Sequence, residues 1–179
     1  YEITTRLVGS EMCIRDSVYI AAFGLFTEVS YKTSQQLKNI FGHVAYIMEG
    51  VKQLRDIPSF RMQVEYDGKV FQDEFIYGMV TNSVSVGGFK GMTGNDVKLD
   101  DGLFEVTLIR NPKNPIELNE ILACLTNMID DSDLIYSFKT DAVHITAKEE
   151  VPWTLDGEFG GAHREVVIRN LKQRVEIFC

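Results

Sequence analysis

The sequence predicts a mainly β fold, a two-sheet β-sandwich with two inserted amphipathic helices. Short runs of alternating apolar and polar residues recur along the 179-residue chain, and turn signals such as Asp-Gly separate them. Apolar residues take helical spacing in two stretches, about 34–54 and 115–129. The length fits about one domain with a sizeable core. Many short strands with few helices are typical of a sandwich.

The first strand and the first helix are expected within residues 18–58. Residues 18–29 are an apolar run interrupted by Gly24, which fits a buried strand that ends in a polar turn. Ser34 then caps a helix, and Pro58 closes the element. The apolar face of this helix consists of Leu37, Ile40, Phe41, Val44, Met48, Val51 and Leu54.

From Phe60 onward the apolar period changes to two. Asp67-Gly68 lies between two alternating runs and predicts a hairpin turn. A continuous apolar strand, a glycine-rich loop and another strand follow at 75–80, 82–99 and 103–109. Pro115 opens the second helix, whose apolar face is Leu118, Ile121, Leu122, Leu125 and Met128. The remaining short strands are expected at 142–146, 153–155, 165–168 and 175–178.

The apolar residues among the first seventeen show neither the period of two of a strand nor the period of 3.6 of a helix, so we expect a leader at 1–17 that is non-native or disordered. The run at 9–17 contains Glu-Met-Cys-Ile-Arg-Asp-Ser and resembles the translation of a transposon adapter used in shotgun sequencing. The origin of residues 1–8 is left open. On this interpretation the natural domain occupies residues 18–179, and the part of the gene product that precedes it is missing.

Composition and charge exclude several classes of function. The net charge of −8 argues against nucleic-acid binding, because phosphate contacts need a basic surface. No apolar run is long enough to span a membrane, and no signal peptide is visible. The 3 cysteines and 3 histidines are widely spaced and match no metal motif. We therefore expect a cytoplasmic protein without a zinc site.

The most informative stretch is Trp-Thr-Leu-Asp-Gly-Glu-Phe-Gly-Gly at 153–161. A strand-like run delivers Asp156 and Glu158 to a turn flanked by glycines, so two carboxylates can face an open cleft. A general base or a magnesium-linked carboxylate needs such access. Asp-Gly is also the commonest hairpin signal, and Asp67-Gly68 is an internal example of a plain turn. From the residues alone, a turn and a functional site both remain open.

A second acidic turn, Asp100-Asp101-Gly102, precedes the strand expected at 103–109. It is either a solvated turn or a set of oxygen ligands of the kind that magnesium binds. The glycines of the loop at 86–89 lack the spacing of a phosphate-binding loop, and no helix follows them.

Taken together, these motifs resemble the C-terminal half of the bacterial soluble diacylglycerol kinase family, the YegS/BmrU-like lipid kinases. The resemblance runs in order from about residue 18 to 178. It comprises the strand AAFGLFTEVSY at 21–31, the run KNIFGHVAY at 38–46, Thr81-Asn82 with Val86–Phe89, Asp101-Gly102, and Leu155-Asp156-Gly157-Glu158 with Gly160-Gly161. Each motif is modest alone, and their order and spacing make the match specific.

The resemblance implies a two-domain kinase that uses ATP and magnesium, with its active site between the domains. The missing N-terminal domain would carry the nucleotide loop, and this chain would supply the acceptor side. Glu158 looks like the proton acceptor for the lipid hydroxyl, and Asp156 would join the acidic network that orders magnesium and water. Asp101, with the backbone carbonyls of Lys98 and Leu103, looks like a structural magnesium site. Phosphoryl transfer depends mainly on such positioning and charge neutralisation.

The resemblance also implies diacylglycerol as substrate, phosphatidate as product, and transient contact with the inner membrane surface. The fragment alone would be inactive, and a homodimer is left open. One alternative is a β-sandwich module that binds a lipid or another ligand without catalysis. Another is a kinase for a different lipid alcohol, such as a sphingoid base. A two-carboxylate glycosidase would need carboxyl groups on both sides of a groove, whereas Asp156 and Glu158 lie on one turn.

Overall fold

The computed structural model describes residues 2–7, 13–17, 19–25, 57–84, 97–125 and 132–171. In these ranges the chain forms nine strands and one helix. The strands are β1 (Glu2–Leu7), β2 (Cys13–Ser17), β3 (Ile20–Gly24), β4 (Phe60–Tyr66), β5 (Lys69–Thr81), β6 (Phe104–Arg110), β7 (Ile135–Thr140), β8 (Ala142–Leu155) and β9 (Glu158–Leu171). The helix is α2 (Pro115–Leu125).

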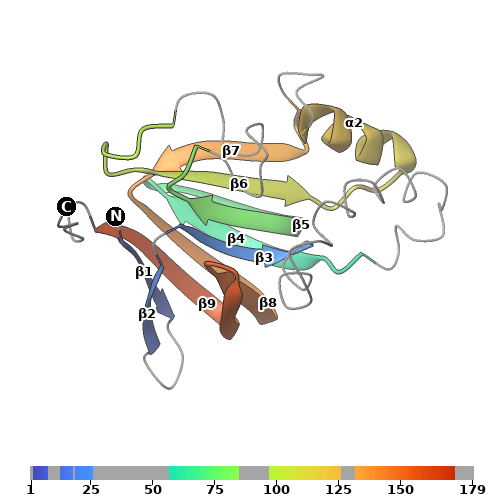
Figure 1. The fold of residues 1–179 in the computed structure, drawn as a ribbon. Coiled ribbons are helices and arrows are strands. Elements are labelled where there is room, and N and C mark those ends of the chain that lie inside the picture. The colour runs from blue at the N-terminus through green and yellow to red at the C-terminus, as the bar shows by residue number, and fades with distance from the viewer. Residues whose placement is uncertain are drawn as a thin grey trace.

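All of these strands belong to one antiparallel sheet in the order β2-β1-β9-β8-β3-β5-β6-β7, with β4 paired to both β5 and β8. Figure 1 shows the sheet curving from β7 at the top to β1 and β2 at the bottom. The predicted mainly β class is confirmed. The described strands form one continuous sheet instead of two, because β5 and β8 are long enough to pair with successive neighbours. The result is a sandwich with a barrel-like curvature.

β3 and β4 occupy the same strand position in the sheet, one after the other, between β5 and β8. β3 pairs with the end of β5 and the end of β8, and β4 pairs with the beginning of each. Both run antiparallel to their two neighbours. They are therefore the two halves of one interrupted strand, which stops at Gly24 and resumes at Phe60.

The interruption falls at a bulge in β5. The pairing of β5 with β6 shifts register between Phe75 and Tyr77, which leaves Ile76 as the extra residue. The Ile76 carbonyl oxygen accepts a hydrogen bond from the Leu25 backbone nitrogen at 2.8 Å. Gly24 has φ +83°, and a Cβ there would lie 2.2 Å from the same oxygen. Only glycine fits this position, which explains why a glycine ends the predicted apolar run.

Two apolar clusters occupy the two faces of the sheet. Alternate residues of β6 separate them, since Phe104 and Leu108 point to one face and Ile109 to the other. The larger cluster fills the concave face around the fully buried Trp153, whose ring lies 5.0 Å from that of Phe23. The second cluster packs β3, β5 and β6 against α2 through Ile20, Ala22, Ile76, Tyr77, Met79, Ile109, Ile121 and Leu125.

Helix α2 confirms the second predicted helix. It begins at Pro115 as expected, and residues 126–131 lie outside the described part of the chain. Asn114 is the cap, because its Oδ1 accepts hydrogen bonds from the backbone nitrogens of Ile116 and Glu117 at 3.0 Å. Glu117 in turn accepts hydrogen bonds from the backbone nitrogen of Lys113, the residue before the cap, and from the side-chain nitrogen of Asn114. The first predicted helix, 34–54, lies outside the described residues.

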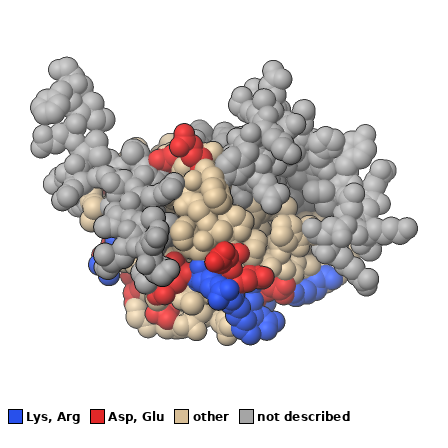
Figure 2. Space-filling model, turned by 90° about the horizontal axis from the view of Figure 1, so that it is seen from below, with Lys and Arg blue, Asp and Glu red and all other residues tan. Residues whose placement is uncertain are grey.

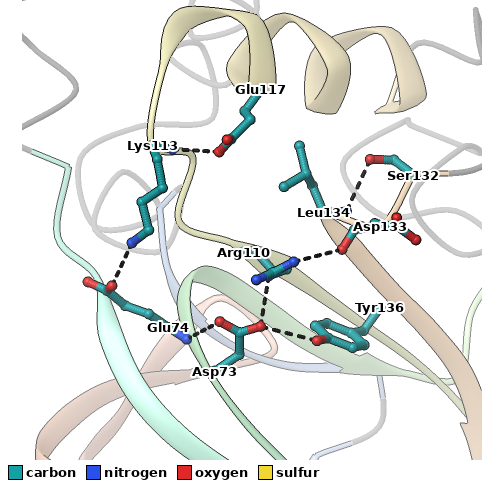
Figure 3. A network of polar contacts seen from close by, with 9 residues as sticks. All are labelled: Asp73, Glu74, Arg110, Lys113, Glu117, Ser132, Asp133, Leu134 and Tyr136. Atoms are coloured by element: carbon teal, nitrogen blue, oxygen red, sulfur yellow. Dashed lines mark hydrogen bonds and ion pairs between the residues drawn. The ribbon is translucent and has the colours of Figure 1, made fainter.

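A polar network at the start of α2 ties it to the sheet (Figure 3). Asp73 on β5 forms an ion pair with Arg110 at 2.7 Å and accepts a hydrogen bond from the Tyr136 hydroxyl. Its neighbour Glu74 forms an ion pair with Lys113 at 2.7 Å. The network therefore links β5, β6, β7 and the segment that leads into the helix.

Residues 2–7 and 13–17 of the expected leader form strands β1 and β2. β1 and β2 form a hairpin, and β1 pairs with β9 along six positions from Glu2↔Leu171 to Leu7↔Val166. Such edge pairing is made by backbone groups, which explains why it needs no amphipathic period in the sequence. Whether residues 9–17 are native to the gene stays a prediction. β7 was not predicted, and the strand expected at 175–178 lies outside the described residues.

Charged side chains of both signs intermingle on the described part of the face seen from below in Figure 2. The described part of this face therefore presents no single-sign patch. Within the described ranges, no helix is both long and apolar enough to cross a membrane.

Candidate functional site

The two predicted acidic turns lie at the same end of the sheet. Leu155, Ala21, Val80 and Val106 form a row of directly paired residues across β8, β3, β5 and β6. Asp156 follows the first residue of this row, and the segment with Asp101 leads into the last strand. Three strand spacings separate the two ends of the row, or about 14 Å. The fold thus brings both turns to the same end of the sheet, but it does not bring their side chains together into one cluster.

Asp156-Gly157 is a two-residue hairpin turn between β8 and β9. Its φ angles of +51° and +89° closely match those of Asp67-Gly68, +47° and +74°. Both therefore have the left-handed backbone of a type I′ turn. The turn prediction is confirmed at both positions, so backbone shape does not distinguish the candidate site from the plain hairpin. The contacts of the two aspartates do.

Asp156 bonds to the start of β3, a segment far from it in sequence. Its Oδ1 accepts hydrogen bonds from the backbone nitrogens of Tyr19 and Ile20, both at 2.9 Å. Its own nitrogen donates to the Ile20 carbonyl at 2.9 Å. By contrast, Asp67 Oδ1 accepts from the Thr140 hydroxyl. Asp156 is therefore built into the junction of three strands.

Glu158 is the first residue of β9 and pairs with Leu155 across the turn. Its side chain is exposed at the tip of the hairpin, next to the half-exposed ring of Phe159. A carboxylate in this position is accessible to a substrate that approaches the sheet end, which is the first requirement of a general base.

The glycines after Glu158 form a bulge in β9. Trp153 pairs with Gly161 and Thr154 pairs with Phe159, so Gly160 is the extra residue. Gly161 has φ +105°, and a Cβ at Gly160 would lie 2.9 Å from the Leu155 side chain. The bulge changes the direction of the last residues of the hairpin, and such bulges often re-aim a side chain at an active site.

A chain of hydrogen bonds connects the two acidic turns. The Tyr19 carbonyl, one residue before Ile20, accepts from the Thr81 hydroxyl at 2.7 Å and from the Asn82 backbone nitrogen at 3.4 Å. The Asn82 side-chain nitrogen donates to the Leu99 carbonyl at 3.4 Å. The start of β3 therefore contacts the Asp156 turn on one side and the end of β5 on the other.

Asp101 is half-buried and folds its own segment. Its Oδ1 accepts from the Leu103 backbone nitrogen at 2.9 Å, and the Leu103 carbonyl accepts from Asn170 on β9 at 3.3 Å. One carboxylate with the carbonyls of Lys98 and Leu103 is a set of hard oxygen donors, so these residues fit magnesium chemically. No group of three or more His, Cys, Asp or Glu side chains in the described ranges is arranged to hold a metal.

Glu105 on β6 is a polar residue of this region that sequence reasoning missed. It is 3% exposed, and within the described residues neither side-chain oxygen accepts a hydrogen bond. It forms an ion pair with Lys139 at 3.6 Å. Burial raises the pKa of the Glu105 carboxyl, Lys139 opposes this shift, and Asp101 adds to it. In sequence, Glu105 alternates with apolar residues and reads as the exposed face of a strand, so no pattern marks it as buried.

Orphaned oxygens also occur on two asparagines that contact the Asp101 segment. Asn82 and Asn170 each donate to a carbonyl of that segment, yet among the described residues their buried Oδ1 atoms accept no hydrogen bond. These two asparagines thus place acceptor oxygens without a described donor beside the turn. Buried acceptors without donors favour a bound cation or ordered water nearby, which agrees with the donor set at Asp101.

Comparison with known proteins gives consistent matches. Residues 21–177 match the model of the YegS C-terminal NAD kinase beta sandwich-like domain. A diacylglycerol kinase of Staphylococcus carnosus is 35% identical over 170 residues, which cover 94% of this chain and 54% of the relative. One from Bacillus subtilis is 34% identical over 146 residues, which cover 80% and 47%. The chain thus spans about half the length of the curated relatives it matches.

Solved structures show the same fold. A diacylglycerol kinase from Bacillus anthracis superposes with a TM-score of 0.58 at 19% identity, over 96% of this chain and 50% of that one. At this identity the likeness supports the fold alone.

Proposed function

The chain belongs to the YegS C-terminal domain family of lipid kinases, and we propose that it is the acceptor-side domain of a kinase that phosphorylates diacylglycerol. The product would be phosphatidate, and ATP would be the phosphoryl donor. The remaining half of the relatives' length would correspond to the nucleotide-binding domain that this chain lacks. Contact with the lipid substrate would take place at the inner surface of the cytoplasmic membrane and would be transient.

The observation that carries the proposal is the exposed Glu158 on a hairpin tip whose backbone is held by a bulge and by β3. Glu158 would accept the proton of the lipid hydroxyl while the hydroxyl oxygen forms a bond to the γ-phosphorus of ATP. The bond from that phosphorus to the β-phosphate oxygen would break, which releases ADP. A general base of this kind contributes about 10²–10⁴-fold to the rate. Asp156 would belong to the acidic network at the same site.

Magnesium has two proposed places. At the reaction centre it would neutralise phosphate charge, which is its usual contribution to phosphoryl transfer. At the second place, Asp101 and the carbonyls of Lys98 and Leu103 would hold an ion about three strands away from Glu158. That ion would stabilise the turn before β6, because it would give a partner to acceptor oxygens that have no donor among the described residues.

The test replaces Glu158 in the full-length enzyme that carries this chain. Glutamine keeps the shape of the side chain but cannot take the proton, so Glu158→Gln should lower kcat for diacylglycerol by about two to four orders of magnitude with little change in ATP binding. Transfer of labelled phosphate from ATP into lipid micelles measures it.

The matched control is Asp67→Asn in the similar hairpin, which should leave turnover within about threefold. A panel with a sphingoid base and other lipid alcohols identifies the acceptor. A folded Glu158→Gln enzyme with near-normal turnover would falsify the role of proton acceptor. If the unmodified enzyme bound these lipids without phosphorylating any of them, the chain would be a binding module instead.

A further inference from the structure

The tip of the β8–β9 hairpin is set apart from the rest of the hairpin. The bulge at Gly160 separates the last two pairs, Thr154↔Phe159 and Leu155↔Glu158, from the remainder of the ladder. On its other side β9 pairs with β1, and this pairing covers only the far end of the strand, residues 166–171. Among the described strands, the segment with Glu158 therefore has β8 as its sole neighbour.

β8 is in turn held at the tip by β3. Three residue pairs, from Phe23↔Trp153 to Ala21↔Leu155, join the two strands. Beyond the last pair, the described contact continues through Asp156, which donates one hydrogen bond to Ile20 and accepts two at its Oδ1. The Asp156 carboxylate thus clasps the start of β3 to the turn that precedes Glu158.

Asp67 shows what the same turn is like without this clasp. Its φ is within a few degrees of that of Asp156, and its turn joins β4 and β5 with the same two-residue spacing. Its Oδ1 accepts from one side-chain hydroxyl, that of Thr140, instead of two backbone nitrogens. A type I′ turn therefore does not require a clasp, and the contacts of Asp156 need another explanation.

We propose that Asp156 is a positioning residue for Glu158, an inference that rests on the proposed function. Its clasp fixes the hairpin tip to β3, and so sets where the Glu158 carboxylate meets the acceptor hydroxyl. What the site requires from Asp156 is an acceptor oxygen at two backbone amides, more than a negative charge. A catalytic geometry displaced by about 1 Å can lower a rate about hundredfold, so such a clasp is worth preserving.

Two substitutions at Asp156 distinguish the effect of its acceptor oxygen from the effect of its negative charge. Asp156→Gly removes the carboxylate and keeps a residue that accepts positive φ, so it adds no backbone strain. Asp156→Asn keeps an acceptor oxygen and tolerance for positive φ, and removes the charge. Asp67→Gly and Asp67→Asn are the matched controls. Each variant is made in the 179-residue chain for amide hydrogen exchange by NMR, and in the full-length enzyme for kinetics.

In Asp156→Gly, exchange of the Tyr19 and Ile20 amides should accelerate about tenfold or more, and kcat should fall about hundredfold with KM for ATP within about threefold. Asp156→Asn should restore the protection of both amides and most of the lost turnover. If Asn protects the amides but leaves kcat as low as Gly does, the charge is what matters and the inference is wrong. Unchanged amide exchange in Asp156→Gly would likewise overturn it.

The exchange measurement also separates this inference from the proposed function. If the full-length enzyme phosphorylated no lipid, the proposed function would fail and the role of the clasp in turnover would fail with it. The exchange rates of Tyr19 and Ile20 would still report whether the clasp itself exists. If Asp156→Gly does not fold, Asp156→Asn still decides, because fast exchange at these amides in a folded Asn variant contradicts a clasp made by an acceptor oxygen.

Discussion

Alanine at Gly24 should destabilise the domain far more than alanine at Gly68. Both glycines have left-handed backbones, with φ +83° and +74°. Placing alanine in this conformation costs about 1 kcal/mol at either position. The surroundings differ, since a Cβ at Gly68 would meet no atom within 4 Å, whereas a Cβ at Gly24 would lie 2.2 Å from the Ile76 carbonyl oxygen and 2.9 Å from its carbon. The contact at Gly24 is with backbone, which cannot rotate away.

The larger loss at Gly24 follows from what must move. β3 has to separate from β5 at the bulge, and the 2.8 Å hydrogen bond from Leu25 to the Ile76 carbonyl is lost. A buried carbonyl without a partner costs about 1–3 kcal/mol, in addition to the backbone strain. We expect a total of about 2–4 kcal/mol for Gly24→Ala and about 1 kcal/mol for Gly68→Ala. Because a domain of this size has about 5–15 kcal/mol in total, the first variant should lose a large fraction of its stability.

Equilibrium unfolding in urea measures both free energies. The single tryptophan, Trp153, is 2% exposed and packs on Phe23 of β3, so its fluorescence reports directly on the strand that the substitution displaces. Equal losses for the two variants would refute the argument, because they would mean that the approach of Ile76 to Gly24 carries no energy beyond the left-handed φ.

Two further predictions concern charge. Ser59, Asn111 and above all Lys113 donate hydrogen bonds to Glu74 and lower its pKa from 4.5 to about 2. The carboxylate therefore stabilises the fold above pH 4.5, and this stabilisation of about 1–2 kcal/mol should disappear as the pH falls towards 2. In Glu74→Gln that part of the acid-induced loss should be missing from melting curves, and identical pH profiles for both proteins would contradict it. Asp101→Ala should abolish the rise in melting temperature on adding magnesium to the chain, which differential scanning calorimetry with and without chelator measures. Equal curves in the unmodified protein would reduce Asp101 to a turn residue.

Local signals predicted the turns and α2, and they failed where distant segments meet. Asp67-Gly68 and Asp156-Gly157 are two-residue turns because each pattern fixes its own backbone. The partners of Asp156 are 136 and 137 positions away, so no local pattern distinguishes it from Asp67. The identity of the site came from the order of the motifs along the chain, while its hydrogen bonds come from the sheet.

Glu105 shows a second limit. Strict alternation along β6 predicts correctly that it lies on the face opposite Phe104 and Leu108. Alternation also implies that a charged residue on that face is exposed, yet Glu105 is 3% exposed. Which face is covered depends on other parts of the chain, and a period of two carries no information about that cover. That β3 and β4 occupy the same strand position could not be predicted for a similar reason, because their register with β5 and β8 determines it.

The strand position that β3 and β4 share has a consequence for the order of folding. β4–β5 and β8–β9 are hairpins that close over two residues, so each can form early from local contacts. β3 instead pairs with residues 53 to 61 positions away on β5 and 130 to 134 positions away on β8. Loop-closure entropy makes such a strand slow to insert, so we expect β3 to join the sheet after both hairpins have formed. The hydrogen bonds of Asp156 to β3 form only at that step, so a chain in which β3 is not yet in place lacks the contact that we propose positions Glu158.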